Sequence, residues 1–239
     1  MELTVLLWGF DTELIITVYN KDMNMICAIN SNQMQKILPP PSVTPIPELL
    51  WYKLNDNIFN YKMTNSPVLE ATCNGIPAYT ASRLPGINCF SFTGGTSSNW
   101  LNLPALARTT TLTFSCWINV QTFALYSRVF DFGGTFRIHI VNANTLRFND
   151  AHSFVYATTF QNAWKHLLFT VNGTTLTFYE NAAVKSTFTM ASSLSTVPTI
   201  GYIAHSYASN DVNPAAKYSD LRVYNRVISN AEIVTLFNN

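Results

Sequence analysis

Residues 111–120 read Thr111-Leu112-Thr113-Phe114-Ser115-Cys116-Trp117-Ile118-Asn119-Val120, and every even position carries an apolar side chain. Successive side chains of a β-strand point to opposite faces of the sheet, so a repeat of two residues predicts a strand with one buried face. The repeat runs for ten residues and makes this segment the clearest strand in the chain. It also places the Cys116 thiol in the predicted core, in phase with Phe114 and Ile118.

Shorter segments of the same character surround this strand and are separated by polar turns. Asn172-Gly173 is a strong turn signal, because both residues tolerate the positive φ angles that a tight hairpin requires. Further strands are predicted at residues 136–140, 146–148, 165–171, 175–179 and 221–224. A series of short strands joined by polar turns is typical of an all-β sandwich.

The last residues of the chain instead predict a short helix. Ser229 and Glu232 are spaced as a capping box, in which each side chain binds the backbone N–H of the other residue. Ile233, Leu236 and Phe237 then form one apolar stripe at helical spacing. We therefore expect one C-terminal helix on an otherwise all-β chain.

The first 38 residues form a separate part of the sequence. Apolar runs at residues 3–8, 13–19 and 25–29 are divided by turn signals, which predicts a short β-meander. Such a meander is not very stable alone, so we expect it to pack on another surface. Five of the ten residues from Leu38 to Pro47 are prolines, a density that favours a stiff, extended linker. The predicted organisation is an N-terminal β extension at 1–38, a proline-rich linker at 39–47 and a sandwich at 48–239.

The charge balance argues against several classes of partner. The chain has 14 basic and 13 acidic residues, and the basic residues are scattered singly, so no surface for nucleic acid is predicted. No apolar stretch approaches the roughly 20 residues that a membrane-spanning helix needs. The apolar start, residues 1–8, lacks the basic region of a signal peptide and is interpreted as a strand.

The four cysteines lack the paired spacing of a zinc site. They are Cys27, Cys73, Cys89 and Cys116. Cys73 and Cys89 could form a disulfide in an oxidising compartment, and the alternative, which we expect, is that they are free buried thiols.

From residue 49 to residue 239 the chain resembles the laminin-G-like, concanavalin A-like jelly-roll family. The segments that carry the resemblance, in the family's order, are CFSFTGG at 89–95 with WLNL at 100–103, LTFSCWIN at 112–119, WKHLLFT at 164–170, LTFYENA at 176–182, and DLRVYNR at 220–226 with SNAEI at 229–233. The resemblance implies an antiparallel jelly-roll β-sandwich. The family includes glycan-binding modules, adhesion domains, sialidase-associated domains and virus-particle components, so it implies no single function. Residues 1–47 fall outside the resemblance.

A catalytic branch of this family hydrolyses glycosidic bonds with carboxylates that lie on one strand as E-x-D-x-x-E. Such hydrolysis needs two carboxylates that flank the scissile bond, and the motif does not occur in this chain. The glutamates after the linker are Glu48, Glu70, Glu180 and Glu232. The histidines, His139, His152, His166 and His205, have no nucleophile motif beside them. His166 follows the family's strand pattern and is predicted to be a structural hydrogen-bonding residue. We predict that the protein is not an enzyme.

The resemblance also implies one metal site. In related folds an acidic residue near the first strand and the aspartate of the closing strand share a hard cation with backbone carbonyls. The matching positions here are Asp56 and Asp220, whose carboxylate oxygens suit calcium. The alternative is that Asp56 ends a strand and Asp220 caps a turn. A structural calcium ion is the one cofactor that we consider.

Ligand contact is predicted within residues 202–220, which we expect to form a long loop between two strands. Loops on a rigid sandwich often carry recognition, and aromatic side chains beside amides suit the apolar face and hydroxyl edge of a sugar. The candidate ligand-binding residues are His205, Tyr207, Asn210, Asp211 and Asn213. A plain solvent loop has the same composition and is the alternative. A second patch, Arg137, His139 and Arg147, is expected on an outward sheet face, which either binds a ligand or is only solvated.

These features favour a non-catalytic structural or binding protein. We expect the N-terminal extension to contact other protein subunits and to hold the jelly roll in a larger assembly, such as a virus particle or a cell-surface structure. The composition fits this setting, because 25 Asn and 27 Thr stand against 27 charged residues. The alternative is a free-standing carbohydrate-binding lectin, and a third hypothesis is an unusual glycoside hydrolase. The expected location is a virion or the extracellular surface.

Overall fold

The computed structural model contains two compact units, residues 1–43 and 44–239. In the first unit it describes the backbone of residues 3–10, 13–20 and 25–29. In the second unit it describes residues 44–58, 70–95, 99–106, 109–132, 136–148, 152–157, 159–194, 199–205 and 213–239.

The first unit is a three-stranded antiparallel sheet with the order β1-β2-β3. Its strands are β1 (Leu3–Phe10), β2 (Glu13–Asn20) and β3 (Met25–Ile29). Strands that pair in chain order form a meander, and each strand begins at the residue predicted from the apolar runs. The predicted N-terminal β-meander is therefore confirmed.

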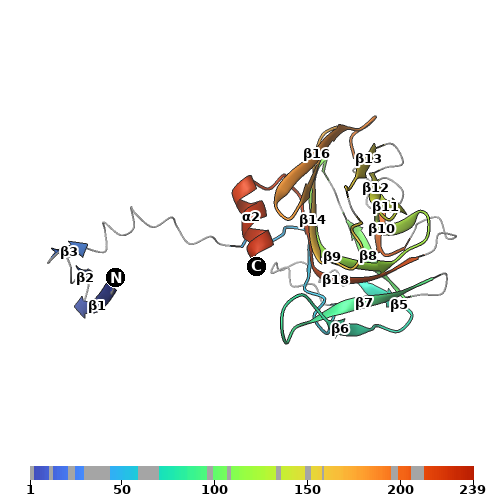
Figure 1. Ribbon diagram of the computed structural model, residues 1–239. Coiled ribbons are helices and arrows are strands. Elements are labelled where there is room, and N and C mark those ends of the chain that lie inside the picture. The colour runs from blue at the N-terminus through green and yellow to red at the C-terminus, as the bar shows by residue number, and fades with distance from the viewer. Residues whose placement is uncertain are drawn as a thin grey trace. The chain divides into compact units, whose positions relative to one another are not determined.

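The second unit is a sandwich of two antiparallel sheets, which are the two layers of Figure 1. The seven-stranded sheet has the order β13-β12-β11-β10-β17-β8-β5 and the eight-stranded sheet has the order β16-β15-β14-β9-β18-β7-β6, with β4 paired to β18. The strands of the seven-stranded sheet are β5 (Thr72–Asn74), β8 (Trp100–Leu106), β10 (Ser127–Phe132), β11 (Phe136–Asn142), β12 (Thr145–Phe148), β13 (His152–Val155) and β17 (Thr199–Ile203). The strands of the eight-stranded sheet are β4 (Leu50–Tyr52), β6 (Tyr79–Ala81), β7 (Asn88–Gly95), β9 (Thr111–Thr122), β14 (Lys165–Asn172), β15 (Thr175–Glu180), β16 (Ala183–Thr189) and β18 (Asn213–Tyr224). The helix α2 (Asn230–Asn238) follows, so the predicted all-β sandwich with a short C-terminal helix is confirmed.

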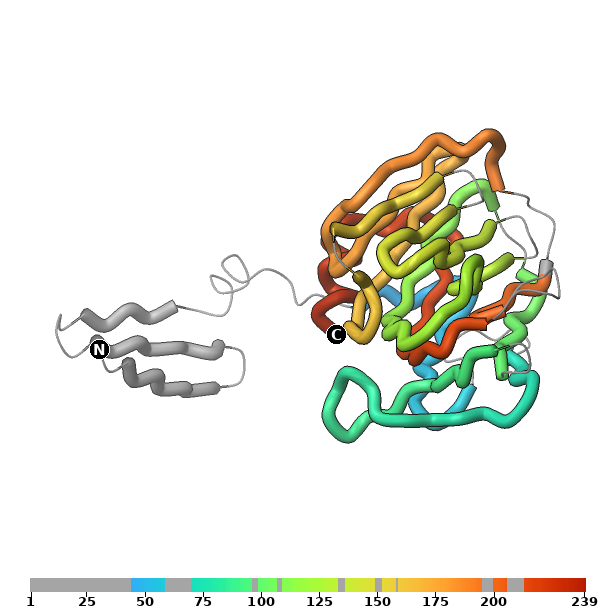
Figure 2. The backbone as a smooth tube through the Cα atoms, turned by 45° about the vertical axis from the view of Figure 1, so that its right-hand side comes forward, coloured from blue at the N-terminus to red at the C-terminus, as the bar shows by residue number. Residues whose placement is uncertain are grey.

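Strand β18, near the end of the chain, pairs with strands from the beginning of the second unit. It pairs with β9 along one edge and with β7 and β4 along the other. Figure 2 shows the result, because early and late segments of the second unit lie side by side in one layer. The fold therefore needs contacts between residues that are far apart in the sequence.

The core between the sheets is rich in phenylalanine. From the eight-stranded sheet, Phe114 stacks on Phe130 of the seven-stranded sheet, with ring centroids 4.1 Å apart. Phe169 packs against Phe148 in a tilted arrangement, with ring centroids 5.4 Å apart. Cys116 lies in this core and is fully buried, as the alternation of residues 111–120 predicted.

The other face of β9 is also buried, which the alternation did not predict. Helix α2 packs over this face, where Ile233 and Leu236 pack in one apolar cluster with Leu168 and Tyr224. Farther along the helix, Phe237 stacks on Trp117 of β9 with ring centroids 5.6 Å apart. The helix therefore covers part of the sheet face that would otherwise meet solvent.

The start of α2 has the predicted capping box. The side chain of Ser229 accepts a hydrogen bond from the Glu232 N–H, and the Glu232 carboxylate accepts one from the Ser229 N–H. Arg226 donates to both carboxylate oxygens of Glu232, at 2.6 and 2.9 Å. The guanidinium of Arg226 is the largest cause that lowers the pKa of Glu232 to about 2.

Two predicted turns differ in detail. The hairpin between β14 and β15 turns at Gly173-Thr174, one residue later than predicted, with a φ of 58° at Gly173. The predicted loop over residues 202–220 is wrong at both ends, because β17 ends at Ile203 and β18 begins at Asn213. The start of β18 contains Pro214, Ala215 and Ala216, which are weak strand formers, so pairing with β9 and β7 decides its conformation.

Three cysteines belong to the sandwich, and all are free thiols. Cys73 donates to the carbonyl of its neighbour Asn74, whereas Cys89 donates to the carbonyls of Thr80 and Ala81. Burial raises the pKa of Cys89 to about 11, so this thiol is protonated at neutral pH. Within the described ranges, no helix has the length and apolar character to cross a membrane.

Candidate functional site

An aromatic and amide-rich surface lies on the outer face of the seven-stranded sheet. On β8, Leu101 and Leu103 point into the core, so that the alternate residues Trp100 and Asn102 face outward. On the neighbouring strand β17, Tyr202 pairs with Asn102 in the strand register and shares its face. All three outward side chains are half-buried.

His205 completes this surface from the residue stretch that follows β17. Its imidazole stacks on the indole of Trp100, with ring centroids 4.0 Å apart and planes 13° apart, and meets Tyr202 edge-on at 5.6 Å. The Nδ1 atom of His205 lies 3.1 Å from Oδ1 of Asn213, which can only accept, so Nδ1–H is the donor. The indole N–H of Trp100 donates to Oδ1 of Asn102 at 3.0 Å. We call these five residues the aromatic–amide cluster.

The structure describes two of the five predicted ligand-binding residues, His205 and Asn213. The structure brings His205 and Asn213 into direct contact. Tyr207, Asn210 and Asp211 lie outside the described residues. The sequence analysis missed Trp100 and Asn102, although their alternation with leucines in the segment at 100–103 is a signal for an outward-facing pair. It also treated Tyr202 as the edge of a loop and not as an outward strand residue.

A row of charged residues continues along the same sheet face. Asp131 of β10 pairs with Tyr202 on one side and with Arg137 on the other, and His139 pairs with Arg147 one strand farther on. Asp131 and His139 are fully buried. For His139, therefore, the solvated-face alternative is wrong.

Arg128 links the charged row into one network. Its Nη1 atom lies 2.7 Å from Nδ1 of His139, and its Nε atom lies 3.9 Å from a carboxylate oxygen of Asp131. A guanidinium can only donate, so Nδ1 of His139 accepts and the proton of the neutral ring is on Nε2. The network holds these side chains in one arrangement beside the aromatic–amide cluster.

Three of the described glutamates, Glu48, Glu180 and Glu232, are held in ion pairs with basic side chains. Glu180 is in an ion pair with Lys165 at 3.0 Å. Glu48 and Glu232 both bind Arg226, at 2.7 and 2.6 Å.

The two predicted calcium ligands have protein partners. Asp56 accepts a hydrogen bond from the Asn88 side chain at 2.6 Å. Asp220 accepts from the indole N–H of Trp51 at 2.8 Å and from Nε of Arg222 at 2.9 Å. In the part of the chain that the structure describes, no group of three or more His, Cys, Asp or Glu side chains could hold a metal ion. Calcium at Asp56 and Asp220 stays a prediction.

His166 is structural, as predicted. Its Nε2 atom lies 2.8 Å from the hydroxyl of Ser115, and its backbone N–H donates to Oδ1 of Asn181. His166 is 2% exposed and Ser115 is 1% exposed, so no substrate reaches this serine–histidine pair. Burial lowers the pKa of His166 to about 4 and keeps the ring neutral at physiological pH.

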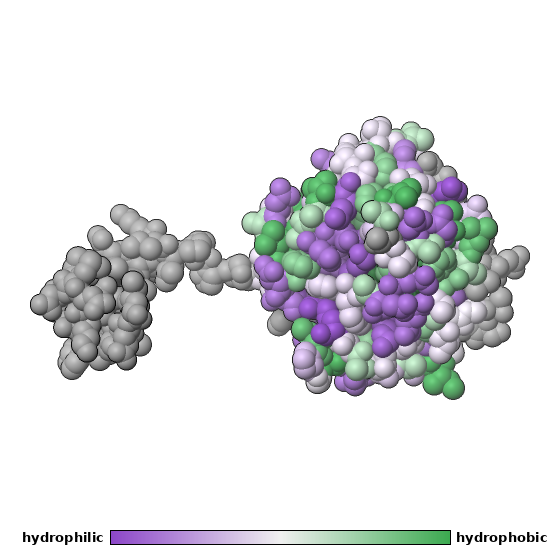
Figure 3. Space-filling view, viewed as in Figure 1, coloured by the Kyte–Doolittle hydropathy of each residue, from purple (hydrophilic) through white to green (hydrophobic). Residues whose placement is uncertain are grey.

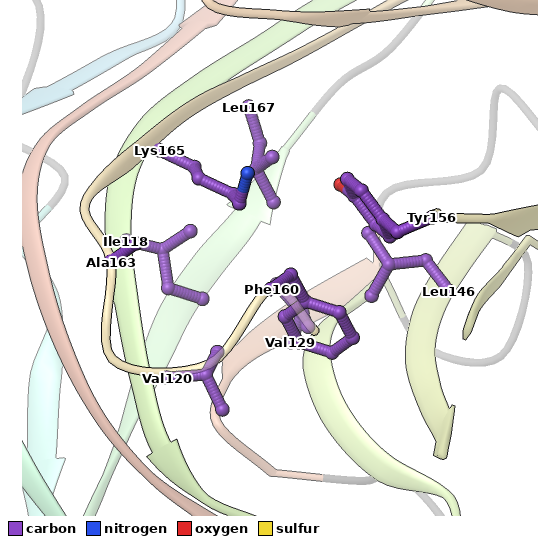
Figure 4. Close-up of a pocket in the computed structure, with 9 residues that line it drawn as sticks. All are labelled: Ile118, Val120, Val129, Leu146, Tyr156, Phe160, Ala163, Lys165 and Leu167. Atoms are coloured by element: carbon purple, nitrogen blue, oxygen red, sulfur yellow. The ribbon is translucent and has the colours of Figure 1, made fainter. Parts of the chain in front are cut away.

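A small enclosed cavity lies between the sheets. Figure 4 shows its lining, in which Tyr156 and Lys165 stand among apolar side chains. Its volume is about 10 Å³. A buried water needs at least about 10–15 Å³, so this cavity is a packing void and not a ligand site.

The surface that Figure 3 shows is mixed in character. Polar and apolar side chains alternate over that face of the sandwich without one dominant apolar area. Large contiguous apolar patches mark protein or membrane contacts. The face drawn in Figure 3 therefore lacks the mark of such a contact.

Comparison with known families agrees with the fold. A family model described as the concanavalin A-like lectin/glucanases superfamily matches residues 93–234. The chain belongs to this superfamily. The match includes β9, β14 and β18 as well as every residue of the aromatic–amide cluster. A search of curated proteins found no match.

Solved structures of this superfamily fold are similar despite low sequence identity. Domain 4 of AbnA, a GH43 extracellular arabinanase from Geobacillus stearothermophilus in complex with arabinotriose, has a TM-score of 0.64 and 14% identity, over 79% of this chain and 97% of that chain. The binding domain of botulinum neurotoxin DC has a TM-score of 0.60 and 15% identity in complex with rat synaptotagmin II, over 80% of this chain and 51% of that one. The same binding domain in complex with SialylT has a TM-score of 0.59 and 13% identity, over 82% and 51%. This chain spans about half of the neurotoxin domain, and the likeness shows a shared fold.

Proposed function

We propose that the sandwich is a non-catalytic carbohydrate-binding module whose ligand contacts the aromatic–amide cluster. The observation that carries this proposal is the flat stack of His205 on Trp100, flanked by Tyr202, on an outer sheet face. Ligand sites combine apolar and aromatic surface with a few placed polar groups. A sugar ring has both characters, because its C–H face is apolar and its hydroxyls form hydrogen bonds.

The aromatic–amide cluster also contains the polar groups that hydrogen bonds to sugar hydroxyls require. The half-buried Asn102 supplies an amide beside the stacked rings, and the buried Asn213 fixes the imidazole of His205. An amide both donates and accepts, as a hydroxyl does, so the pair suits a ligand that carries several hydroxyls. The side chains are held before the ligand arrives, which lowers the entropy that binding costs.

The similar structures support a binding role. AbnA domain 4 is in complex with arabinotriose, and the neurotoxin binding domains are in complex with SialylT or synaptotagmin. A protein ligand is therefore the second candidate. The cluster favours a carbohydrate, because its aromatic rings are flanked by neutral amides.

The carboxylates support a module without hydrolytic activity. Glu48, Glu180 and Glu232 are each engaged by a basic side chain. A general acid needs a carboxyl group free to protonate the leaving oxygen. Incubation with polysaccharides should therefore release no sugar, and any reducing end that forms would contradict this part of the proposal.

A glycan array on the full chain tests the proposal. We expect binding to one group of glycans, which Trp100→Ala abolishes. Phe188→Ala is the matched control, because Phe188 stacks on His152 at 5.0 Å elsewhere in the sandwich. A full chain that binds no glycan, or a Trp100→Ala variant that binds as well as Phe188→Ala, would contradict the proposal.

The role of the N-terminal unit in a larger assembly stays a prediction. Its three-stranded sheet is a separate compact unit. Such a sheet has little capacity to bury apolar surface alone, which supports contact with a further protein surface.

A further inference from the structure

A second hollow lies on the outer face of the eight-stranded sheet. On β18, Leu221 and Val223 point into the core and Arg222 points outward, and on β4 Trp51 points outward between Leu50 and Tyr52. The hollow is lined by Trp51, Lys53, Asn55, Arg83, Leu84, Ile87, Ser219, Asp220, Arg222 and Asn239. Its volume is about 210 Å³.

The charges around the hollow favour an anion. The lining contains three basic side chains, Lys53, Arg83 and Arg222, and one acidic side chain, Asp220. Arg222 already pairs with Asp220 at 2.9 Å, and Trp51 donates to the same carboxylate oxygen. The basic side chains of the lining therefore outnumber its acidic side chain, which favours an anion as the ligand.

Among the described residues, Arg83 is the basic residue of the lining that has a buried donor without a partner. Its guanidinium lies over the Trp117 ring, 3.9 Å from the centroid. Its Nε atom is buried and has no hydrogen-bond acceptor among the described residues. A buried donor of a charged group costs stability when it has no acceptor, and a bound carboxylate supplies two acceptor oxygens. Burial is also the largest cause that lowers the pKa of Arg83, with Asp220 acting in the opposite direction.

Asn55 contributes a hydrogen-bond acceptor, whereas Arg83 contributes a donor. Its Oδ1 atom is buried and has no donor among the residues that the structure describes. An amide oxygen only accepts, so it needs an O–H or N–H from a ligand. One hollow therefore lacks an acceptor at Arg83 and a donor at Asn55, and a molecule with both a carboxylate and a hydroxyl supplies both.

The backbone of Asp220 shows that the hollow is a built feature. Asp220 has a φ of 51°, in the left-handed region that residues other than glycine seldom adopt. It lies in a β-bulge, where the register of β18 with β9 shifts between Ser219 and Arg222. Bulges and strained residues concentrate at binding sites, where they redirect a side chain.

We propose that this hollow binds a small hydroxylated carboxylate, such as a sugar acid, through Arg83 and Asn55. The site is on the opposite sheet from the aromatic–amide cluster and does not depend on that cluster. The side walls formed by Leu84 and Ile87 contact the apolar part of the ligand. Asp220 holds Trp51 and Arg222 in place and does not contact the anion.

The test follows the five tryptophan indole N–H signals of the full chain by nuclear magnetic resonance. Sodium glucuronate is the probe, and glucose is the matched neutral sugar. Trp51→Phe and Trp117→Phe assign the two signals near the hollow. We expect glucuronate to move both signals to a saturating limit, while the Trp100 signal stays unchanged. Glucose and sodium chloride at equal ionic strength should move neither.

Variants separate recognition from a general charge effect. Arg83→Gln should weaken glucuronate binding at least tenfold, and Arg83→Lys should restore part of it, because the charge returns without the Nε donor. The Trp100 signal and the melting temperature report whether each variant is folded. Lys53→Gln, on the rim of the same hollow, should weaken binding less.

Several outcomes would overturn the proposal. Equal shifts with sodium chloride, or unchanged affinity in Arg83→Gln, would mean that no site recognises the carboxylate. Sulfate that binds as tightly as glucuronate would remove the role of the hydroxyl and of Asn55. Saturation of the Trp51 signal by calcium chloride, without any response to glucuronate, would assign the hollow to a cation. The Trp100→Ala variant should bind glucuronate normally, so failure here and failure of the carbohydrate proposal are distinguishable.

Discussion

The imidazole of His205 lies flat on the indole of Trp100, with 4.0 Å between ring centroids and 13° between planes. Trp100 is the first residue of β8, and His205 follows the end of β17. Asn213, the first residue of β18, holds the other edge of the imidazole. Three strand ends therefore fix one aromatic surface in a single arrangement.

Removing the hydrogen bond that holds His205 should lower the affinity for glycan more than it lowers the free energy of unfolding. Asn213→Ala deletes the acceptor of the Nδ1–H, and a net hydrogen bond contributes about 1 kcal/mol. The affinity should fall about three- to tenfold, measured by titration calorimetry at a temperature where both proteins are folded. The same substitution in a His205→Ala background should have a smaller effect. Equal effects in the two backgrounds would show that Asn213 acts without His205.

His166 should make the folded protein less stable in mild acid. Burial, the largest cause, lowers its pKa to about 4 from the ordinary histidine value of 6.5. As the pH falls from 6.5 to 4, His166 binds a proton in the unfolded chain but stays neutral in the native state. The free energy of unfolding should therefore fall by up to about 3 kcal/mol across this window and level off below it.

Urea unfolding at pH 7.5 and pH 4.5 checks this prediction. His166→Gln should lose most of the difference between the two pH values, because glutamine does not titrate. Parallel pH profiles of the wild type and the variant would show that another group carries the acid sensitivity.

Gly201 should tolerate no side chain while Phe132 keeps its place. A Cβ atom at Gly201 would lie 2.7 Å from two ring carbons of Phe132. Overpacking of this kind costs about 1–3 kcal/mol, so Gly201→Ala should lower the melting temperature by several degrees. Phe132→Leu in the same chain should recover part of the loss. A double variant whose loss is the sum of the two single losses would argue against this clash.

The first unit should determine the oligomeric state. We expect the full chain to oligomerise and residues 44–239 to be monomeric in size-exclusion chromatography with light scattering. The cut is placed before Pro45, because the Pro45 carbonyl accepts hydrogen bonds from Tyr224 and Arg222. Two monomeric proteins would remove the reason to assign an assembly role to the N-terminal sheet.

Periodic segments were predictable from the sequence because burial on one face leaves a local pattern. The alternation at residues 111–120 predicted β9 and the buried Cys116, and the Ser229–Glu232 spacing predicted the cap of α2. The start of β18 was not predictable in this way, because Pro214, Ala215 and Ala216 have little intrinsic strand preference. Its conformation comes from pairing with strands more than ninety residues earlier in the chain.

The candidate site was predictable only in part, for a related reason. His205 and Asn213 stood out because polar aromatic and amide residues gather near them in the sequence. Trp100 comes from a strand more than one hundred residues away, and only the register of β8 with β17 brings it to the same face. The hollow around Asp220 is similar, since Arg83 and Asp220 share it through strand pairing rather than sequence proximity.

Titration of the full chain and its Trp100→Ala variant with the glycan that binds best on the array tests the central claim most directly. The account predicts saturable binding that moves the Trp100 indole signal and leaves the Trp51 signal in place, with at least a tenfold loss in Trp100→Ala and little loss in Phe188→Ala. A glycan that binds the Trp100→Ala variant with unchanged affinity, or one that leaves the Trp100 signal unmoved, would show that the aromatic–amide cluster is not the binding site.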